Sequence, residues 1–150
     1  MRLAVVVNPD AGLGGKLGFK GSDGRAAEAR AAGAQDRAGP RMKICLEKLS
    51  ELARGPIEIL AWDGRMGGDW IPGEYTSTGK TPDTTDASST SEFIKAHSPD
   101  LFLYAGGDGT TRDIVEALED REIPLVGVPG GVKMHSGCFA TTPKAAAEVV

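Results

Sequence analysis

The sequence predicts an α/β fold with an open, mostly parallel sheet, flanking helices and the layering of Rossmann-like domains. Short, continuously apolar runs alternate along the chain with amphipathic helix patterns, and glycine-rich turns follow three of those runs. The chain has 150 residues, of which 40% are hydrophobic and 25% are charged, so it can bury one sizeable core. We therefore expect a single α/β domain over residues 1–150.

Four apolar runs predict the strands. Residues 3–7 (LAVVV) are β-branched and continuously apolar, as in a strand that helices cover on both faces. Residues 57–62, 100–105 and 123–128 form three further runs of this kind. Because helix patterns separate them, parallel pairing with right-handed crossovers is expected.

From Pro40 onward, apolar residues recur at spacings of three and four, which marks the core face of an amphipathic helix that ends at Gly55. They are Met42, Cys45, Leu46, Leu49, Leu52 and Ala53. The alanine-rich stretch before them predicts a separate helical segment that Gly39 and Pro40 interrupt. Shorter helices are expected at 91–97 and 111–118, and irregular chain with one short edge strand at 63–91.

The last ten residues, TTPKAAAEVV, predict a helix that starts shortly before the chain ends. Thr142 is a suitable cap and Pro143 suits a first helical turn. Since about two turns follow, we expect this chain to be the amino-terminal part of a longer protein.

Composition excludes several classes of partner. The chain carries 17 basic and 21 acidic residues, a net charge of -4, without a basic cluster interleaved with aromatics, so nucleic acid is not expected. No apolar run approaches the roughly 20 residues of a membrane span, and the first ten residues turn polar too early for a signal peptide. A cytoplasmic protein without membrane contact is expected. Cys45 and Cys138 are predicted to be reduced core thiols.

Two glycine-rich stretches fail as phosphate loops. GLGGKLG, beginning at Gly12, has Leu17 where the dinucleotide fingerprint G-x-G-x-x-G requires its third glycine. GEYTSTGKT at 73–81 has one residue too many for the pattern G-x-x-x-x-G-K-[ST], and Pro82 follows where a helix should start. We expect the second stretch to be a solvated loop.

The stretch GGDGTT at 106–111 meets the structural requirement that these two fail. It follows a buried-type strand and opens a helix, so backbone amides and the positive end of the helix dipole meet at one spot. This arrangement binds phosphate. The alternative is a tight turn in which Asp108 or Thr110 caps the helix.

Two other turns are expected to share the same edge of the sheet. The carboxyl ends of parallel strands form the ligand crevice, so Asn8, directly after the first strand, would lie near Asp108. A glycine-rich turn after the fourth strand, residues 127–136, carries Lys133, whose ammonium suits a phosphate. His135 in that turn is the weakest candidate, since a lone histidine is more often structural.

These residues resemble the kinases that share a Gly-Gly-Asp-Gly-Thr loop, which include NAD kinases, diacylglycerol and sphingosine kinases and, more distantly, phosphofructokinases. GGDGT at 106–110 is a full match. VVVNPDAGLGGKLGFKGSDG, GGDGTTRDI and GVPGGVKMHSGCFATTP are similar to the ATP-NAD kinase-like branch of archaea and bacteria. The similarity spans nearly the whole chain except residues 64–91.

The resemblance implies a nucleotide-binding α/β domain with kinase activity. ATP or polyphosphate would donate a phosphoryl group to the 2'-hydroxyl of NAD, with Mg²⁺, giving NADP. Asp108 would be catalytic, assisting the hydroxyl, and the rest of the loop would hold phosphates: Gly106, Gly107, Gly109 and Thr110, with Asn8 and Lys133 as further binding residues. Small nucleotides are the expected partners, and the sequence leaves a homo-oligomer and the metal ligands open.

The chain departs from typical NAD kinases in two respects. Those enzymes follow the fourth strand with Gly-Ile-Asn, where this chain has Gly127, Val128 and Pro129. The family's second, β-rich domain, with the Asn-Glu/Asp pair that grips the dinucleotide, is not in this sequence. A lipid kinase and a non-catalytic nucleotide-binding fragment are the alternatives. Lipid kinases continue with Gly-Thr-Gly-Asn-Asp, where this chain reads GGVKMHS.

Overall fold

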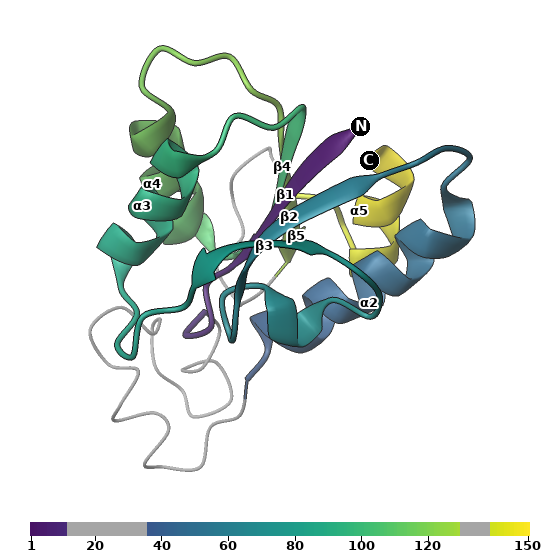
Figure 1. Cartoon of the computed structure of the whole chain (residues 1–150), viewed down its shortest axis with the longest axis horizontal. Helices are drawn as coiled ribbons and strands as arrows, with labels where there is room; N and C mark the ends of the chain where they lie inside the picture. Colours follow the sequence, from purple (N-terminus) through teal and green to yellow (C-terminus); the bar gives the residue numbers. More distant parts are fainter. Residues whose placement is uncertain (12–35, 130–138) are drawn as a thin grey trace.

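The computed structural model describes residues 1–11, 36–129 and 139–150, which form a five-stranded sheet flanked by helices (Figure 1). All strand pairs are parallel. The strands are β1 (Arg2–Val7), β2 (Glu58–Asp63), β3 (Thr76–Lys80), β4 (Leu101–Gly106) and β5 (Leu125–Pro129). The helices are α2 (Ala38–Leu52), α3 (Ala87–Ala96), α4 (Asp108–Leu118) and α5 (Pro143–Val149), with the short 3₁₀ helix η2 (Gly68–Trp70). The predicted α/β class is confirmed.

The strand order is β3-β2-β1-β4-β5, so the first strand lies at the centre of the sheet. The chain runs outward from β1 to β2 and β3 and then returns to the other side of β1 for β4 and β5. The direction of winding therefore reverses between β1 and β4.

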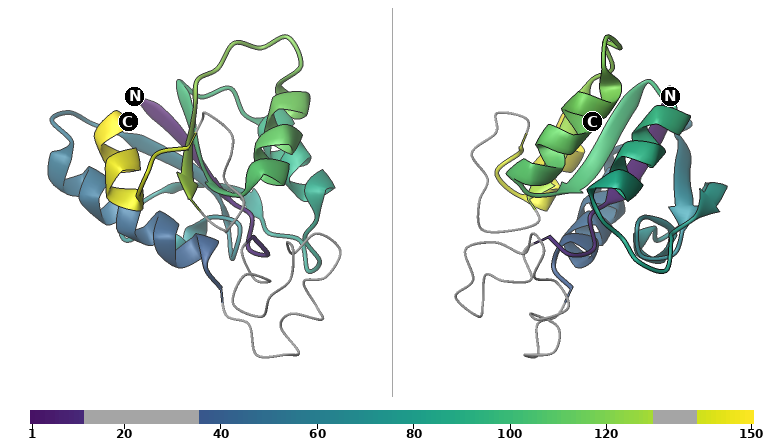
Figure 2. Two further views of the ribbon diagram at one scale, coloured as in Figure 1. Left: turned by 180° about the vertical axis from the view of Figure 1, so that it is seen from behind. Right: turned by 90° about the vertical axis from the view of Figure 1, so that its left-hand side faces the viewer.

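The core has two layers, one on each face of the sheet (Figure 2). Leu3, Val5 and Val7 of β1 belong to the layer under α2 and α5, whereas Ala4 and Val6 belong to the layer under α3 and α4. This alternation follows from the two-residue period of a strand. Since both faces are covered, β1 is apolar and buried from Leu3 to Val7, as its sequence predicts.

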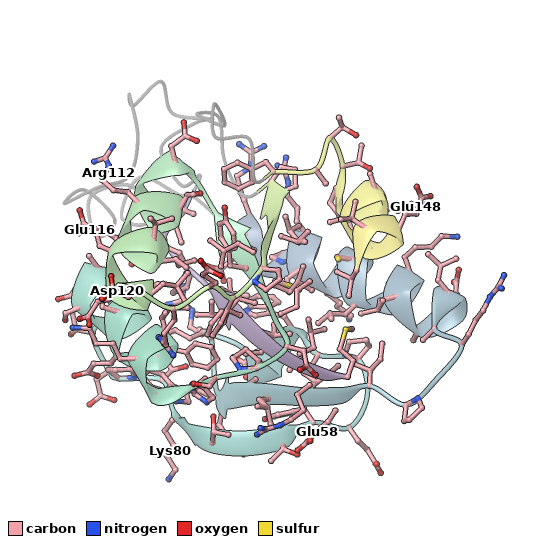
Figure 3. All side chains as sticks on the ribbon, turned by 90° about the horizontal axis from the view of Figure 1, so that it is seen from above. Glu58, Lys80, Arg112, Glu116, Asp120 and Glu148 are labelled. Atoms are coloured by element: carbon pink, nitrogen blue, oxygen red, sulfur yellow. The ribbon has the colours of Figure 1, made fainter. Side chains whose placement is uncertain are left out.

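Charged side chains cover the outside of both layers (Figure 3). Lys80 on the edge strand, Arg112 and Glu116 on α4 and Glu148 on α5 are all exposed. None of the helices within the described ranges is long and apolar enough to cross a membrane.

The helix predicted to start at residue 91 begins at Ala87 instead. Asp86 caps it, because its carboxylate accepts hydrogen bonds from the backbone amides of Ser88 and Ser89 at 2.9 and 3.2 Å. The Ser89 hydroxyl in turn accepts from the Asp86 amide at 3.3 Å, which completes a capping box. Region 63–91 is thus less irregular than predicted. The stretch at 73–81, expected to be a solvated loop, contains the edge strand β3, which pairs with β2 and is the short edge strand expected in this region.

The helix α2 begins at Ala38, two residues before the predicted start at Pro40, so Gly39 and Pro40 lie in its first turn. Because most of the alanine-rich stretch lies outside the described residues, the predicted interruption of a preceding helical segment stays a prediction. A proline in the first turn removes no helical hydrogen bond, since the amide there has no partner within the helix. At its other end, Leu52 is 41% exposed, so the buried face ends at Leu49. Ala53 is the exposed C-cap and not part of the core.

The predictions for the start of the last helix and for Cys45 are confirmed. Thr142 caps α5 by accepting a hydrogen bond of 3.0 Å from the Ala145 amide, with Pro143 in the first turn. Cys45 lies fully buried in the core, and burial raises the pKa of its thiol to about 12. The thiol is therefore protonated at neutral pH. Cys138 and most of the alanine-rich stretch lie outside the described residues.

Candidate functional site

The carboxyl ends of β1 and β4 lie side by side in the middle of the sheet. Val7 pairs with Ala105, and the backbone amide of Asn8 donates to the Ala105 carbonyl at 2.9 Å. Because the winding reverses between these strands, their ends form the switch point at which open α/β sheets bind ligands. This confirms the prediction that Asn8 and the GGDGT turn lie at the same edge of the sheet.

The Asn8 side chain connects the two strand ends. Its Nδ2 donates to the Thr110 Oγ1 at 2.9 Å, and its Oδ1 accepts from the Asp10 amide at 3.1 Å. The second bond is an Asx turn, which fixes the chain as it leaves β1. Both ends of the amide group are thereby oriented, and the start of α4 is attached to the end of β1.

Gly106 permits this connection by having no side chain. A Cβ atom at this position would lie 2.6 Å from the Thr110 Cβ, inside the distance at which two carbon atoms can pack. The bare backbone lets Thr110 pack against the strand end, where it is 4% exposed. The first glycine of GGDGT is thus required by packing within the protein itself.

The helix α4 begins directly after this contact. Gly107 is its N-cap, with extended backbone, and Asp108 is its first residue. The alternative in which Asp108 or Thr110 is the cap is therefore wrong, because the capping position is a glycine. Asp108 and Gly109 are both partly exposed in the first turn, where backbone amides have no acceptor within the helix.

Tyr104 and Thr111 support the turn from inside the protein. Their hydroxyl oxygens are 2.6 Å apart, and the Thr111 hydroxyl also donates to the Gly107 carbonyl at 3.3 Å. Tyr104 is fully buried and packs beside Phe139 with ring centroids 5.6 Å apart. Neither supporting residue was among the predicted site residues. Their adjacency to the GGDGT turn is the signal that points to them.

The segment after β3 also reaches this edge of the sheet. The Thr85 hydroxyl donates to the Asp10 carboxylate at 3.2 Å, which joins the loop before α3 to the turn after β1. Nothing in the sequence of residues 63–91 indicates this contact, because it joins positions 75 residues apart. Asp10 is an additional carboxylate at the switch point.

The segment after β2 folds over the end of β1. The Val7 amide donates to the Met66 carbonyl at 2.8 Å, and Arg65 forms an ion pair of 2.7 Å with Asp36. Nearby, the Tyr75 hydroxyl donates to the Asp63 carboxylate at 2.7 Å, which lowers the pKa of that carboxyl below its ordinary value. The edge of the sheet is thus closed on the β2 side by hydrogen bonds between loops.

Lys133 and His135 lie outside the described residues, as does the glycine-rich stretch from Gly12. The binding roles predicted for Lys133 and for the GGDGT residues stay predictions. Pro129, the last described residue before this segment, pairs with Gly106 in the sheet.

A magnesium ion fits the chemistry of the site only together with a substrate. Within the parts of the chain that are described, no three His, Cys, Asp or Glu side chains form a group able to hold a metal. Mg²⁺ is usually held by one or two carboxylates plus substrate phosphates and water. Asp108, a carboxylate beside a phosphate-binding type of turn, matches that requirement.

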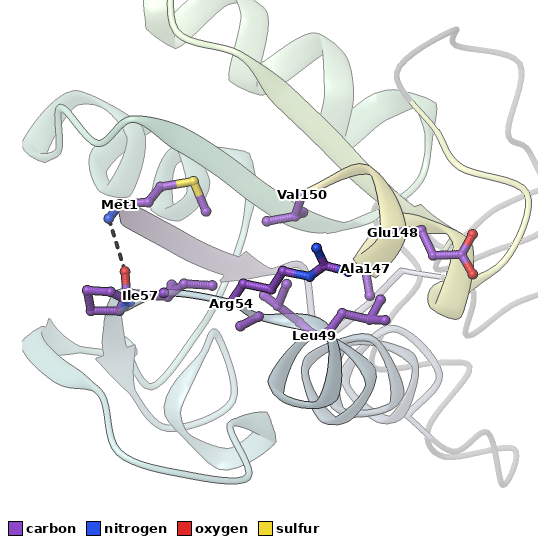
Figure 4. A pocket seen from close by; sticks show the side chains of 11 residues that line it. Met1, Leu49, Arg54, Ile57, Ala147, Glu148 and Val150 are labelled. Carbon is purple, nitrogen blue, oxygen red and sulfur yellow. Dashed lines mark hydrogen bonds between the residues drawn. The ribbon is translucent and has the colours of Figure 1, made fainter.

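A cavity of about 480 Å³ lies at the opposite end of the sheet and contains none of these residues (Figure 4). Met1, Ile57 and Val150 line it together with Leu49 and Arg54. Since ligands of open parallel sheets bind at the carboxyl edge, this cavity is not the candidate site.

Comparison with known proteins agrees with the geometry. No curated protein matches the chain. A family model described as the ATP-NAD kinase N-terminal domain matches residues 3–150. The match includes β1, the GGDGT turn and α5, and therefore nearly every element described above. The chain belongs to the ATP-NAD kinase N-terminal domain family.

Proposed function

We propose that this chain forms the GGDGT half of an NAD kinase site, which transfers a phosphoryl group from ATP or polyphosphate to the 2'-hydroxyl of NAD. Membership of the family supports a role of the NAD kinase type. The observation that carries the proposal is the hydrogen bond of 2.9 Å between Asn8 and Thr110, which holds the GGDGT turn at the switch point.

Catalysis at such a site is mostly positioning and charge stabilisation. The first-turn amides of α4, from Asp108 to Thr110, would hold the donor phosphates, with the helix dipole favouring the negative charge. Gly107 keeps a side chain away from the approaching phosphate, whereas Gly106 lets Thr110 pack beneath the turn. The small residues of the turn thus leave space for the donor beside the only acidic side chain of the motif.

In the reaction, a bond forms between the 2'-oxygen of NAD and the terminal phosphorus, and the bond from that phosphorus to its leaving oxygen breaks. Asp108 would orient the hydroxyl and accept its proton. When bound, Mg²⁺ would neutralise charge on the phosphates, and helping to hold it is the alternative role for the Asp108 carboxylate. The cap position belongs to Gly107, so this chemistry does not compete with capping for the Asp108 carboxylate.

We further propose that the domain works as the amino-terminal part of a two-domain cytoplasmic enzyme whose partners are small nucleotides. The second domain would bury the dinucleotide. Residues 1–150 alone would then bind adenine nucleotide weakly and form little NADP.

The test is NADP formation by the full-length protein, measured with NAD as acceptor and with ATP or polyphosphate as donor. We expect NADP from at least one donor, and very little from residues 1–150 alone. Phosphorylation of diacylglycerol or sphingosine in place of NAD would establish the lipid kinase alternative. Nucleotide binding without any transfer would leave the non-catalytic alternative.

A further inference from the structure

The start of α2 carries two arginines at the same edge of the sheet as the GGDGT turn (Figure 1). Arg37 is the N-cap and Arg41 lies one turn further, so the two side chains are neighbours on one face of the helix. Both are half-buried. Neither arginine was among the site residues predicted from the sequence.

Arg41 is held close to the GGDGT turn. Its Nη1 donates to the Pro129 carbonyl at 2.9 Å, and Pro129 pairs with Gly106 in the sheet. Neighbouring strands are about 4.8 Å apart, so the guanidinium lies over the end of the strand beside the turn. An arginine has five N–H donors, and this bond uses one of them.

The two arginines carry positive charge that the described part of the chain does not neutralise. Arg65, another arginine at this edge, forms an ion pair with Asp36, but neither Arg37 nor Arg41 forms one with a carboxylate of the described residues. Partial burial and then the charge of Arg37 lower the pKa of Arg41. Among the described residues alone, the arrangement is unfavourable, because like charges are adjacent and both lie at the positive end of a helix.

An anion would relieve this cost, and guanidinium groups bind phosphate through paired hydrogen bonds. We propose that Arg37 and Arg41 form an anion subsite that binds the terminal phosphates of the phosphoryl donor, next to the phosphate held at the GGDGT turn. The assignment of the anion as the donor rests on the proposed function. The positive charge of the two arginines is independent of the proposed function.

A purely structural role makes a different prediction. If Arg41 only fastens α2 to β5 through the Pro129 carbonyl, its loss lowers stability and leaves anion affinity unchanged. Arg37 donates no side-chain hydrogen bond within the described residues, so Arg37→Gln removes charge without removing a contact there. Binding by Arg37→Gln therefore still tests the subsite if Arg41→Gln does not fold.

The experiment measures binding of inorganic tripolyphosphate to the full-length protein by calorimetry at low and high salt. Arg41→Gln and Arg37→Gln are compared with Arg54→Gln, an exposed arginine at the opposite end of the sheet. We expect the Kd to rise by about tenfold in each of the first two variants, as for the loss of a charged hydrogen-bond partner, and to stay unchanged in the third. The effect should shrink at high salt.

Wild-type affinity in both Arg37→Gln and Arg41→Gln, or no tripolyphosphate binding by the wild type, overturns the subsite. Kinetics separate this result from failure of the proposed function. With NADP formation as readout, the KM for the donor should rise in both variants while the KM for NAD stays constant. If the wild type forms no NADP but the variants still weaken tripolyphosphate binding, the anion subsite stands and the proposed reaction falls.

Discussion

Asn8 and Thr110 are 102 positions apart in the sequence, yet the Asn8 Nδ2 donates a hydrogen bond of 2.9 Å to the Thr110 Oγ1. One residue leaves the central strand β1 and the other lies in the first turn of α4. The contact therefore fixes the GGDGT turn relative to the centre of the sheet. Since both residues are at least partly buried, the bond is shielded from competing water.

A double-mutant cycle measures how strongly these residues are coupled. Asn8→Ala and Thr110→Val should each lower the free energy of unfolding by about 1–2 kcal/mol, because a partly buried polar partner is left unsatisfied. The double variant should cost less than the sum by about 0.5–1.5 kcal/mol. Urea denaturation provides the measurement, with Thr110→Ser as the control that keeps the hydroxyl. Strict additivity would mean that the bond contributes nothing.

Gly106→Ala should destabilise the protein by about 1–3 kcal/mol, the usual cost of adding a methyl group where there is no space. The new Cβ would meet Thr110 and push it away from Asn8. Gly55→Ala is the matched control, because a Cβ there has no atom within 4 Å and the variant should be neutral or slightly more stable. Equal melting temperatures for the two variants would contradict the packing argument.

Asp108→Asn separates chemistry from stability. Because Gly107 is the N-cap of α4, loss of the Asp108 charge does not remove the cap, and the helix-dipole contribution that it removes is about 0.3–1 kcal/mol of the free energy of unfolding. Turnover of NADP formation in the full-length protein should fall by at least about 10²-fold, as for loss of a general base. Asp120→Asn, an exposed position after the helix, is the control. Comparable turnover in Asp108→Asn and the wild type would remove Asp108 from the catalytic role.

The Asp63–Tyr75 hydrogen bond predicts a pH dependence with a defined sign. The pKa of Asp63 is lowered, first by Tyr75 and next by Ser77, so the stabilisation is complete above the ordinary carboxyl pKa and is lost as pH falls through the lowered value. The pKa of Tyr75 is raised, first by Asp63, so its contribution is lost as pH rises through that higher value. The bond therefore stabilises the fold between these two limits.

NMR titration of the Asp63 carboxyl tests this prediction. In Tyr75→Phe its pKa should move up toward the ordinary carboxyl value, and Ser77→Ala should move it less, because Tyr75 is the larger cause. An unchanged Asp63 pKa in Tyr75→Phe would show that the hydrogen bond does not form in solution.

The sequence by itself determined the class of the fold and the identity of the central turn. Runs such as residues 3–7 are apolar without alternation, and only a strand covered on both faces needs that pattern. The cap at Thr142 and the glycines of 106–109 are also local signals, because capping and backbone geometry depend on residues that are close in the sequence. These features could be predicted without knowledge of the packing.

Only the tertiary structure decided which residues meet at the crevice. The order β3-β2-β1-β4-β5 depends on how the helix pairs pack on the two faces, and that energy comes from contacts between distant segments. For this reason the Asp10–Thr85 contact and the position of Arg41 over Pro129 have no clear signal in the sequence. The early start of α3, by contrast, has a local signal in the cap at Asp86. Hydrophobic burial is non-directional, so a one-dimensional pattern specifies which residues are buried, whereas close packing in three dimensions selects their neighbours.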